Sequence, residues 1–382
     1  MASLHEIMST QITTRIVSRE AGANHYLLQL FGMQPGGRAE RQVGKRQFGY
    51  DVFNDTRTTA QGRMPGVAAG TATRQVVGRV QGVFPRFNEK LTLLAEELYQ
   101  FRVLGGPSSV YDQRGVQYTL RQQRYMGQRL GNSRMTMLAG LIRGGILYAH
   151  RTGDQVYYDF TSASNSWSID WLMPAANKTQ LNMTGGGNLI TGTWLTPTND
   201  IPSMLNNINA AFQQVVGTTL GTIICPINVW QAVINNDFVM MLAGTSNPPF
   251  TVMERLIGTS DNGLPQTVII ARIAAVPWID WIITDEGLKL GAMGSETFTK
   301  FVPDNYCWMG PSLRGDITNY FELLLGSEPI NEGYGSGETE RYGVHAWTKE
   351  TDDPAGRMLY TVDNSIPANY VPATNCFAQV IF

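Results

Sequence analysis

The chain has 382 residues, of which 16% are charged and 40 are glycine, and its formal net charge is −2. This near-neutral total conceals a division: residues 1–150 hold 19 Lys and Arg against 9 Asp and Glu, whereas residues 151–382 hold 10 against 22. A basic part and an acidic part suit a protein that packs against copies of itself or against an anionic cargo. Because no basic stretch followed by an apolar one opens the sequence, and Arg272, Pro277 and Asp280 interrupt its most apolar run, we expect neither a secretory signal nor a membrane-spanning helix.

The first 90 residues predict an arm followed by a hairpin. Residues 1–45 are polar and lack a sustained apolar period, which is typical of an extended arm. Residues 47–54 and 73–84 have the pattern of strands, and the Gly-, Thr- and Ala-rich stretch between them predicts a long hairpin with its tip near Arg63-Met-Pro-Gly66. A two-stranded ribbon has too little core to be stable alone, so we expect this one to bury its apolar face on a neighbouring molecule.

A long helix is predicted over residues 114–143, after a short apolar-periodic segment at 91–104. The helix holds no proline, places apolar side chains on one stripe, and would reach about 45 Å at 1.5 Å per residue. Its other face carries arginines that either solvate an exposed surface or bind acidic neighbours. Its glycines weaken it by about 1 kcal/mol each, so we expect packing to hold it. The arginines are Arg114, Arg121, Arg124, Arg129 and Arg134, and the glycines are Gly127, Gly131 and Gly140.

Beyond this helix the pattern changes to short strands and then to a mixed unit. Asp200 before Pro202 and the later Gly217 mark the two ends of a predicted helix. Helices are also predicted at residues 229–242, capped by Asn228, and near residues 317–325. Strands are predicted at 146–148, 155–160, 167–171, 219–225, 267–276 and 278–284, and short strands return after residue 341. This order indicates the α+β class, with a mixed sheet flanked by helices.

Patterns typical of catalysis or metal binding are missing from the sequence. The four histidines lie far from one another and from any cysteine, which argues against a zinc site, and no Gly-x-Ser-x-Gly elbow occurs. Cys225, Cys307 and Cys376 lie far apart in apolar stretches and predict buried thiols. Asp285-Glu-Gly287 is interpreted as a turn between strands and not as a pair of catalytic carboxylates. We therefore expect no zinc site, no hydrolytic site and no cofactor.

Nucleic-acid binding is expected to be diffuse if it occurs. The basic residues of the first 90 positions are spread along the sequence and lack the interleaved aromatic side chains of a stacking platform. Sequence-specific recognition is therefore not expected. An electrostatic attraction to a polyanion remains open, because weak contacts add up when many copies line one surface.

Four short stretches occur in a characteristic order. They are Pro85-Arg-Phe87; Leu141-Ile-Arg-Gly-Gly145; Ile279-Asp-Trp-Ile-Ile-Thr-Asp-Glu-Gly287 with Phe301-Val-Pro303 and Met309-Gly-Pro311; and Trp347, Asp353-Pro354, Ser365-Ile-Pro367 and Ala378-Gln-Val380. In these stretches and in their order, the chain resembles the major capsid proteins of lambda-like tailed phages, the protein E family, which share the Hong Kong 97 capsid fold. The resemblance runs through most of the chain and is one of pattern and order.

The resemblance implies a division of the chain into structural parts. It also implies that the hairpin reaches over a neighbouring subunit and that the long helix is the spine of a peripheral domain. The implied parts are an N-terminal arm at 1–45, an extended loop at 46–88, a peripheral domain with the spine helix at 89–200, an axial domain at 201–324, and a return to the peripheral domain at 325–382.

The resemblance implies a non-catalytic virion protein that assembles in the host cytoplasm. Pentamers and hexamers would close into an icosahedral shell around double-stranded DNA, with scaffold, portal and decoration proteins as further partners. No cleavable scaffolding domain and no cross-linking pair is recognisable. Two alternatives stay open: a nanocompartment shell of the same fold that encloses an enzyme, and a soluble oligomeric enzyme. The candidates for contact between subunits are Arg57, Arg63, Met64, Arg74, Arg79, Arg114, Arg121 and Arg124.

Overall fold

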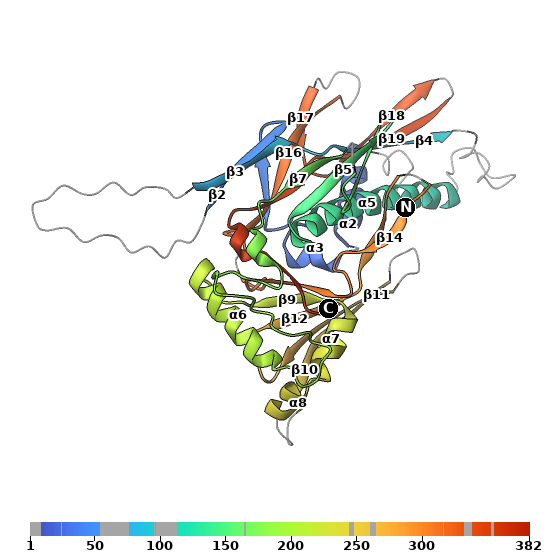
Figure 1. Ribbon diagram of the computed structural model, residues 1–382. Coiled ribbons are helices and arrows are strands. Elements are labelled where there is room, and N and C mark those ends of the chain that lie inside the picture. Colours follow the sequence, from blue (N-terminus) through green and yellow to red (C-terminus); the bar gives the residue numbers. More distant parts are fainter. Residues whose placement is uncertain are drawn as a thin grey trace, which may run out of the picture. The chain divides into compact units, whose positions relative to one another are not determined.

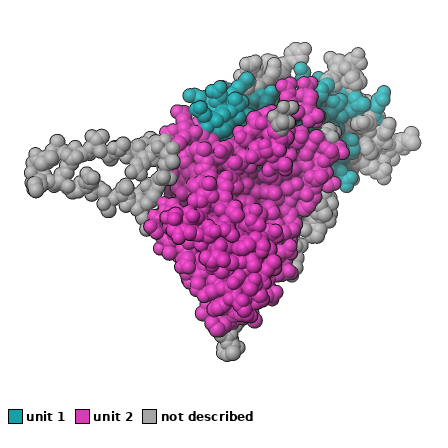
Figure 2. Space-filling model, in the orientation of Figure 1, with its two compact units in different colours: residues 1–48, 81–138, 322–368 teal, residues 49–80, 139–321, 369–382 magenta. Residues whose placement is uncertain are grey.

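The computed structural model of the chain forms two compact units that interleave along the sequence. One unit, called unit 1 here, comprises residues 1–48, 81–138 and 322–368, and unit 2 comprises residues 49–80, 139–321 and 369–382 (Figure 2). The structure describes residues 9–23, 25–53, 76–94, 96, 113–163, 166–243, 248–259, 265–292, 294–315, 317–331, 338–352 and 355–382.

Two helices pack closely in unit 1. Helix α2 (Thr10–Ala23) buries Val17 and Ala21, four residues apart, against α5 (Gln113–Ile142), which confirms the predicted long helix. The close approach needs two glycines of α5: a Cβ on Gly127 would lie 2.6 Å from the Val17 carbonyl oxygen, and one on Gly131 would lie 2.4 Å from that of Ala21. The prediction of an extended arm is therefore wrong for residues 10–23. Their helix is stabilised by packing, which a search for apolar periodicity in the segment alone does not detect.

The sheets of unit 1 bring both ends of the sequence together. Strands β18 (His345–Asp352), β19 (Ala355–Asp363) and β4 (Phe87–Leu94) form an antiparallel sheet in that order. Helix α2 lies along its β18 edge, where the Thr14 hydroxyl donates to the Ala346 carbonyl and accepts from the Ala346 amide. A second sheet holds β1 (Glu40–Val43), β16 (Phe321–Asn331), β17 (Glu338–Tyr342) and β20 (Ser365–Asn369), and α3 (Tyr26–Leu30) precedes β1 (Figure 1).

Two predictions for these segments are wrong. The helix predicted near residues 317–325 is the start of β16, which pairs in parallel with β1 from Glu40 to Val43. Leu323, Leu324 and Leu325 are all buried, so this strand is covered on both faces and shows no alternation of apolar and polar residues. The segment predicted at 91–104 begins as the end of β4 and not as a helix, and its residues 95 and 97–104 lie outside the described residues.

Unit 2 is built on a seven-stranded mixed sheet. Its order is β10 (Phe250–Thr259), β11 (Pro265–Ile273), β12 (Asp280–Thr284), β9 (Thr222–Cys225), β15 (Tyr306–Gly310), β21 (Cys376–Gln379) and β8 (Lys178–Thr179). Alternate residues such as Ile223, Trp281 and Met309 belong to one core with the apolar faces of helices α6 (Ile201–Val216) and α7 (Ile227–Ile234), which lie beside the sheet in Figure 1. The predicted mixed sheet flanked by helices is confirmed, although strands β8, β10 and β15 were not predicted.

Some of the helix ends in unit 2 agree with the prediction from the sequence, and others do not. Asp200 caps α6 by accepting from the Ser203 amide, and Gly217 ends it with a φ of 83°, as predicted. The single helix predicted at 229–242 is instead α7 and α8 (Asp237–Ala243). The predicted cap at Asn228 is wrong, because α7 begins at Ile227 with Pro226 at its N-cap position. Asn236 instead caps the start of α8 by accepting from the amides of Phe238 and Val239.

The remaining elements of unit 2 are short. Strands β5 (Ile146–Thr152), β6 (Gln155–Asp159) and β7 (Trp167–Asp170) confirm the three short strands predicted here and form one sheet, and β13 (Gly287–Leu290) pairs with β14 (Thr297–Lys300). Two 3-10 turns, at Ala175–Asn177 and Pro372–Thr374, lie near the C-terminal strand. All three cysteines are buried as free thiols, which confirms their prediction, and burial raises the pKa of each.

Candidate functional site

The base of the predicted hairpin is a strand pair anchored within the chain. Strand β2 (Gln47–Phe53) pairs with β3 (Val76–Val83), which confirms the two strands. Within unit 1 the Phe48 ring meets Phe84 edge to face at 5.4 Å, and within unit 2 Tyr50 meets Tyr370 at 5.3 Å. The expectation that the hairpin buries its apolar face only on a neighbour is therefore wrong at its base. The predicted tip, residues 63–66, lies outside the described residues.

The arginines predicted to contact other subunits are only partly described. Arg57, Arg63, Met64 and Arg74 lie outside the described residues, as does the side chain of Arg114. Arg79 is exposed on β3, and its guanidinium lies over Gly49 of β2: a Cβ there would lie 3.2 Å from Nη2. Arg79 makes no ion pair with a described residue.

The exposed face of α5 carries a row of basic side chains. Arg124 lies with Nε 3.6 Å from a carboxylate oxygen of Glu20 on α2, and Arg129 lies 2.8 Å from Glu89 on β4. Arg129 also covers the half-exposed Tyr125 ring at 5.6 Å. Arg121 is exposed and pairs with no acidic side chain among the described residues. Of the two interpretations left open for this face, binding of acidic neighbours holds for Arg124 and Arg129 and solvent exposure for Arg121.

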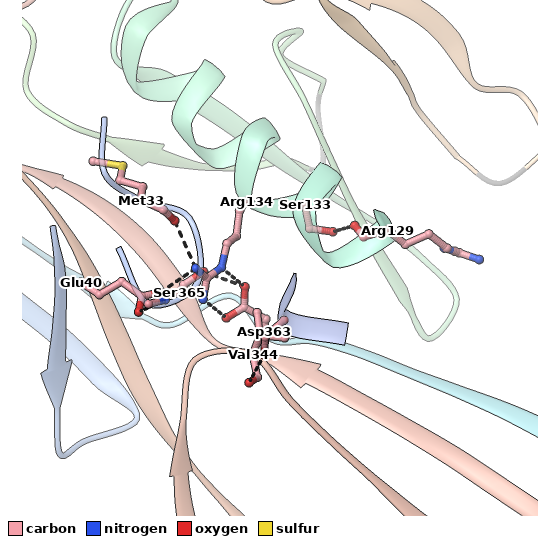
Figure 3. Close-up of polar contacts among 10 residues, drawn as sticks. Met33, Glu40, Arg129, Ser133, Arg134, Val344, Asp363 and Ser365 are labelled. Atoms are coloured by element: carbon pink, nitrogen blue, oxygen red, sulfur yellow. Dashed lines mark hydrogen bonds and ion pairs between the residues drawn. The ribbon is translucent and has the colours of Figure 1, made fainter. Parts of the chain in front are cut away.

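Arg134 does not belong to that exposed face. Its side chain is completely buried, and Nε and Nη2 lie 2.6 and 3.1 Å from the two carboxylate oxygens of Asp363 (Figure 3). Nη1 donates to Glu40 at 2.7 Å and to the Met33 carbonyl at 3.1 Å. One guanidinium therefore joins helix α5, the start of β1, the segment before it and the end of β19.

Electrostatics favour the charged form of Arg134 despite its burial. Burial by itself would lower the pKa of the guanidinium, but the carboxylates of Asp363 and Glu40 outweigh burial and raise the pKa. Asp363 is also held by the Ser365 hydroxyl, at 3.0 Å. A bidentate arginine-carboxylate pair fixes geometry as well as charge. This arrangement holds segments of unit 1 in register and has no feature of a reaction centre.

Glu286, which the sequence placed in a turn, is another buried charged residue. It lies between β12 and β13, where a turn was predicted, with its amide donating to the Thr284 hydroxyl and its carbonyl accepting from the Phe301 amide. Its side chain is 6% exposed, and neither carboxyl oxygen has a hydrogen-bond partner among the described residues. Burial raises the pKa of this carboxyl from its ordinary 4.5 to about 7.

The sequence held a signal for one of these two residues. Arg134 follows Leu130 by four residues and precedes Leu138 by four, so helical spacing places it on the apolar stripe of α5 and predicts its burial. Glu286 offers no comparable signal, because Asp-Glu-Gly is an ordinary turn sequence and its burial depends on the surrounding fold.

The described residues contain no group of three His, Cys, Asp or Glu side chains that could hold a metal ion. No helix in the described part of the chain is long and apolar enough to cross a membrane.

Comparison with known proteins identifies the fold. No family model matches the chain, and no curated protein matches it significantly. Among solved structures, it is similar to a protein assigned as a prophage capsid protein of Escherichia coli CFT073, with 12% identity, a TM-score of 0.54, and coverage of 97% of this chain and 99% of that one. Weaker likenesses are a phage-related protein of Bordetella bronchiseptica RB50 (10% identity, TM-score 0.45, 96% of each chain) and a virus-like particle from Pyrococcus furiosus (8%, 0.42, 97% of each).

The predicted fold class is confirmed. The chain is α+β and has a Hong Kong 97-like capsid fold, shared from end to end with the Escherichia coli prophage protein. At 12% identity this likeness establishes the fold, and the function has to be argued from the molecule itself.

Proposed function

We propose that this chain is the major capsid protein of a tailed double-stranded DNA phage and that it assembles through pentamers and hexamers into an icosahedral shell. The observation that carries the proposal is the capsid fold extending over 97% of the chain, with 99% of the prophage protein matched in return. The division between a basic front part and an acidic remainder supports self-packing.

In this proposal the hairpin between β2 and β3 reaches onto an adjoining subunit. Its base is anchored in its own chain by Phe48, Tyr50 and Phe84, which gives the projecting part a fixed origin. Arg79, exposed beside that base, is positioned for an acidic neighbour. The assignment of residues 1–45, 46–88, 89–200, 201–324 and 325–382 to arm, extended loop, peripheral domain, axial domain and peripheral return belongs to the same proposal.

The role of a major capsid protein determines which partners and which location we expect. The protein would act without catalysis or a cofactor, assemble in the host cytoplasm and reside in the virion. Packaged DNA would be attracted by non-specific electrostatics, and scaffold, portal and decoration proteins would complete the particle. The exposed arginines of α5, with Arg121 as the clearest case, are available for such contacts.

Electron microscopy of the purified protein tests the proposal. We expect closed round shells of uniform diameter, made of rings of five and six subunits. Particles that enclose an enzyme and no nucleic acid, after expression with their natural neighbours, would support a nanocompartment instead. A small oligomer at every concentration, seen by sizing chromatography and microscopy, would contradict shell formation and favour a soluble enzyme.

A further inference from the structure

Two arginines of unit 2 share one buried carboxylate at an end of strand β12. Asp280, the first residue of β12, has a side chain that is 6% exposed. Its Oδ1 lies 2.6 Å from Nε of Arg272 on β11, and its Oδ2 lies 2.7 Å from Nε of Arg314, beyond β15. Both arginine side chains remain substantially exposed, at 39% and 46%.

Among the described residues, this arrangement leaves one positive charge uncompensated. A single carboxylate neutralises one guanidinium, and its two oxygens lie at the Nε atoms. The terminal Nη groups of Arg272 and Arg314 have no partner among the described residues, and their N–H donors can bind an acceptor on another molecule. The buried Asp280 fixes the direction of both guanidinium groups, which lowers the conformational entropy that they lose on binding.

An exposed aromatic residue lies in the turn that precedes Asp280. Trp278, two residues before Asp280 in the turn between β11 and β12, is 44% exposed. Tryptophan and arginine are the residues most enriched among those that dominate binding energy at protein interfaces. We therefore propose that Trp278, Arg272 and Arg314 form a docking point for a carboxylate-bearing surface on a second copy of this chain.

The charge distribution favours a second copy as the occupant. Residues 151–382 hold 22 acidic against 10 basic side chains, so a guanidinium pair with a surplus charge is unusual in this part of the chain and is opposite in sign to its net charge. A contact of this kind orients the partners and speeds their encounter. The inference rests on the proposed function, since a shell requires each subunit to bind its neighbours.

The test uses variants that keep Asp280 paired. Arg314→Gln leaves Arg272 and Asp280 as a neutral pair and removes the surplus positive charge. Arg314→Lys keeps the surplus positive charge. Trp278→Ala removes the aromatic anchor from an exposed position. Arg151→Glu, at an exposed arginine of β5, controls for a change of charge elsewhere in unit 2, and Asp316, outside the described residues, is left intact throughout.

Sedimentation measures the concentration at which half of each protein is assembled, and thermal unfolding checks that each is folded. We expect R314Q and W278A to raise this concentration by about tenfold or more, R314K to raise it much less, and R151E to leave it unchanged. Shells formed by R314Q and W278A at the wild-type concentration would overturn the docking point and leave the proposed function standing. A wild type that forms small oligomers without shells would overturn the proposed function. Loss of those oligomers in R314Q would still support the docking point. A wild type that stays monomeric would overturn both proposals.

Discussion

At the residue scale, Arg134 shows how a charge can be buried in a stable core. The guanidinium has two carboxylates and a carbonyl around it, so its desolvation is offset by directed hydrogen bonds. Removing one partner of a buried ion pair leaves the other charge uncompensated, and this costs about 3 to 5 kcal/mol.

We therefore predict that Arg134→Met lowers the free energy of unfolding by about 3 to 5 kcal/mol, because Asp363 and Glu40 lose their shared partner. Denaturant unfolding measures this value. Arg121→Met, on the exposed face of the same helix, is the control and should change stability by less than about 0.5 kcal/mol. Equal stabilities for the two variants would show that the ion pairs of Arg134 do not stabilise unit 1.

Glu286 predicts a dependence of stability on pH. Its pKa is about 7 in the folded chain and 4.5 ordinarily, so the unfolded chain releases this proton at lower pH than the folded chain does. Stability contributed by this group is therefore fully present below pH 4.5 and is lost as the pH rises from 4.5 to about 7. The loss amounts to about 3 kcal/mol, at 1.36 kcal/mol per pKa unit.

We predict that Glu286→Gln removes this slope and makes the protein more stable than the wild type at pH 8. Thermal unfolding between pH 4.5 and 8 measures both effects. Asp154→Asn removes one carboxylate from an exposed turn and serves as the control. A wild-type stability curve that is parallel to that of the Gln variant across this range would contradict the burial of an unpaired carboxyl.

At the scale of elements, the glycines of α5 have separate roles. Gly127 and Gly131 allow α2 to approach, whereas a Cβ on Gly115 of the same helix would meet no atom within 4 Å. The same substitution should therefore have opposite effects along one helix.

We predict that Gly131→Ala destabilises the protein by about 1 to 3 kcal/mol, because the methyl group collides with the Ala21 carbonyl and forces the helices apart. Gly115→Ala should stabilise it by up to about 1 kcal/mol through helix propensity. Chemical denaturation of both variants gives the comparison. If Gly131→Ala were also stabilising, the close packing of α2 on α5 would be incorrect.

The sequence predicted elements whose ends are determined locally. Helix α6 was found because Asp200 caps it and Gly217 ends it, and both signals lie within the element. Helix α2 and strand β16 were missed because each depends on distant partners, the glycines of α5 for one and strand β1 for the other. The pairing of the α5 arginines could not be predicted from the sequence. It depends on Glu20 and Glu89, which lie near α5 only in the folded chain.

At the scale of the whole molecule, the division of charge bears on the proposed assembly. Residues 1–150 carry 10 more basic than acidic side chains, and residues 151–382 carry 12 more acidic than basic. Charges on the surfaces of separate subunits attract one another across solvent, and salt weakens this attraction: the screening length is about 10 Å at 0.1 M and about 3 Å at 1 M. Contacts made by packing of apolar groups do not weaken in this way.

This difference gives a test of the hairpin's proposed contact. Replacing Arg63 with Glu should slow assembly strongly at low salt and weakly near 1 M salt. Salt screens both the attraction that Arg63 provides in the wild type and the repulsion that Glu introduces in the variant, so the two rates converge. Light scattering follows the rate, and Arg151→Glu supplies the same change of charge at an exposed position of β5. Equal slowing at all salt concentrations would mean that Arg63 acts by packing and not by charge. Equal rates for Arg63→Glu and the wild type would place the subunit contact elsewhere on the chain.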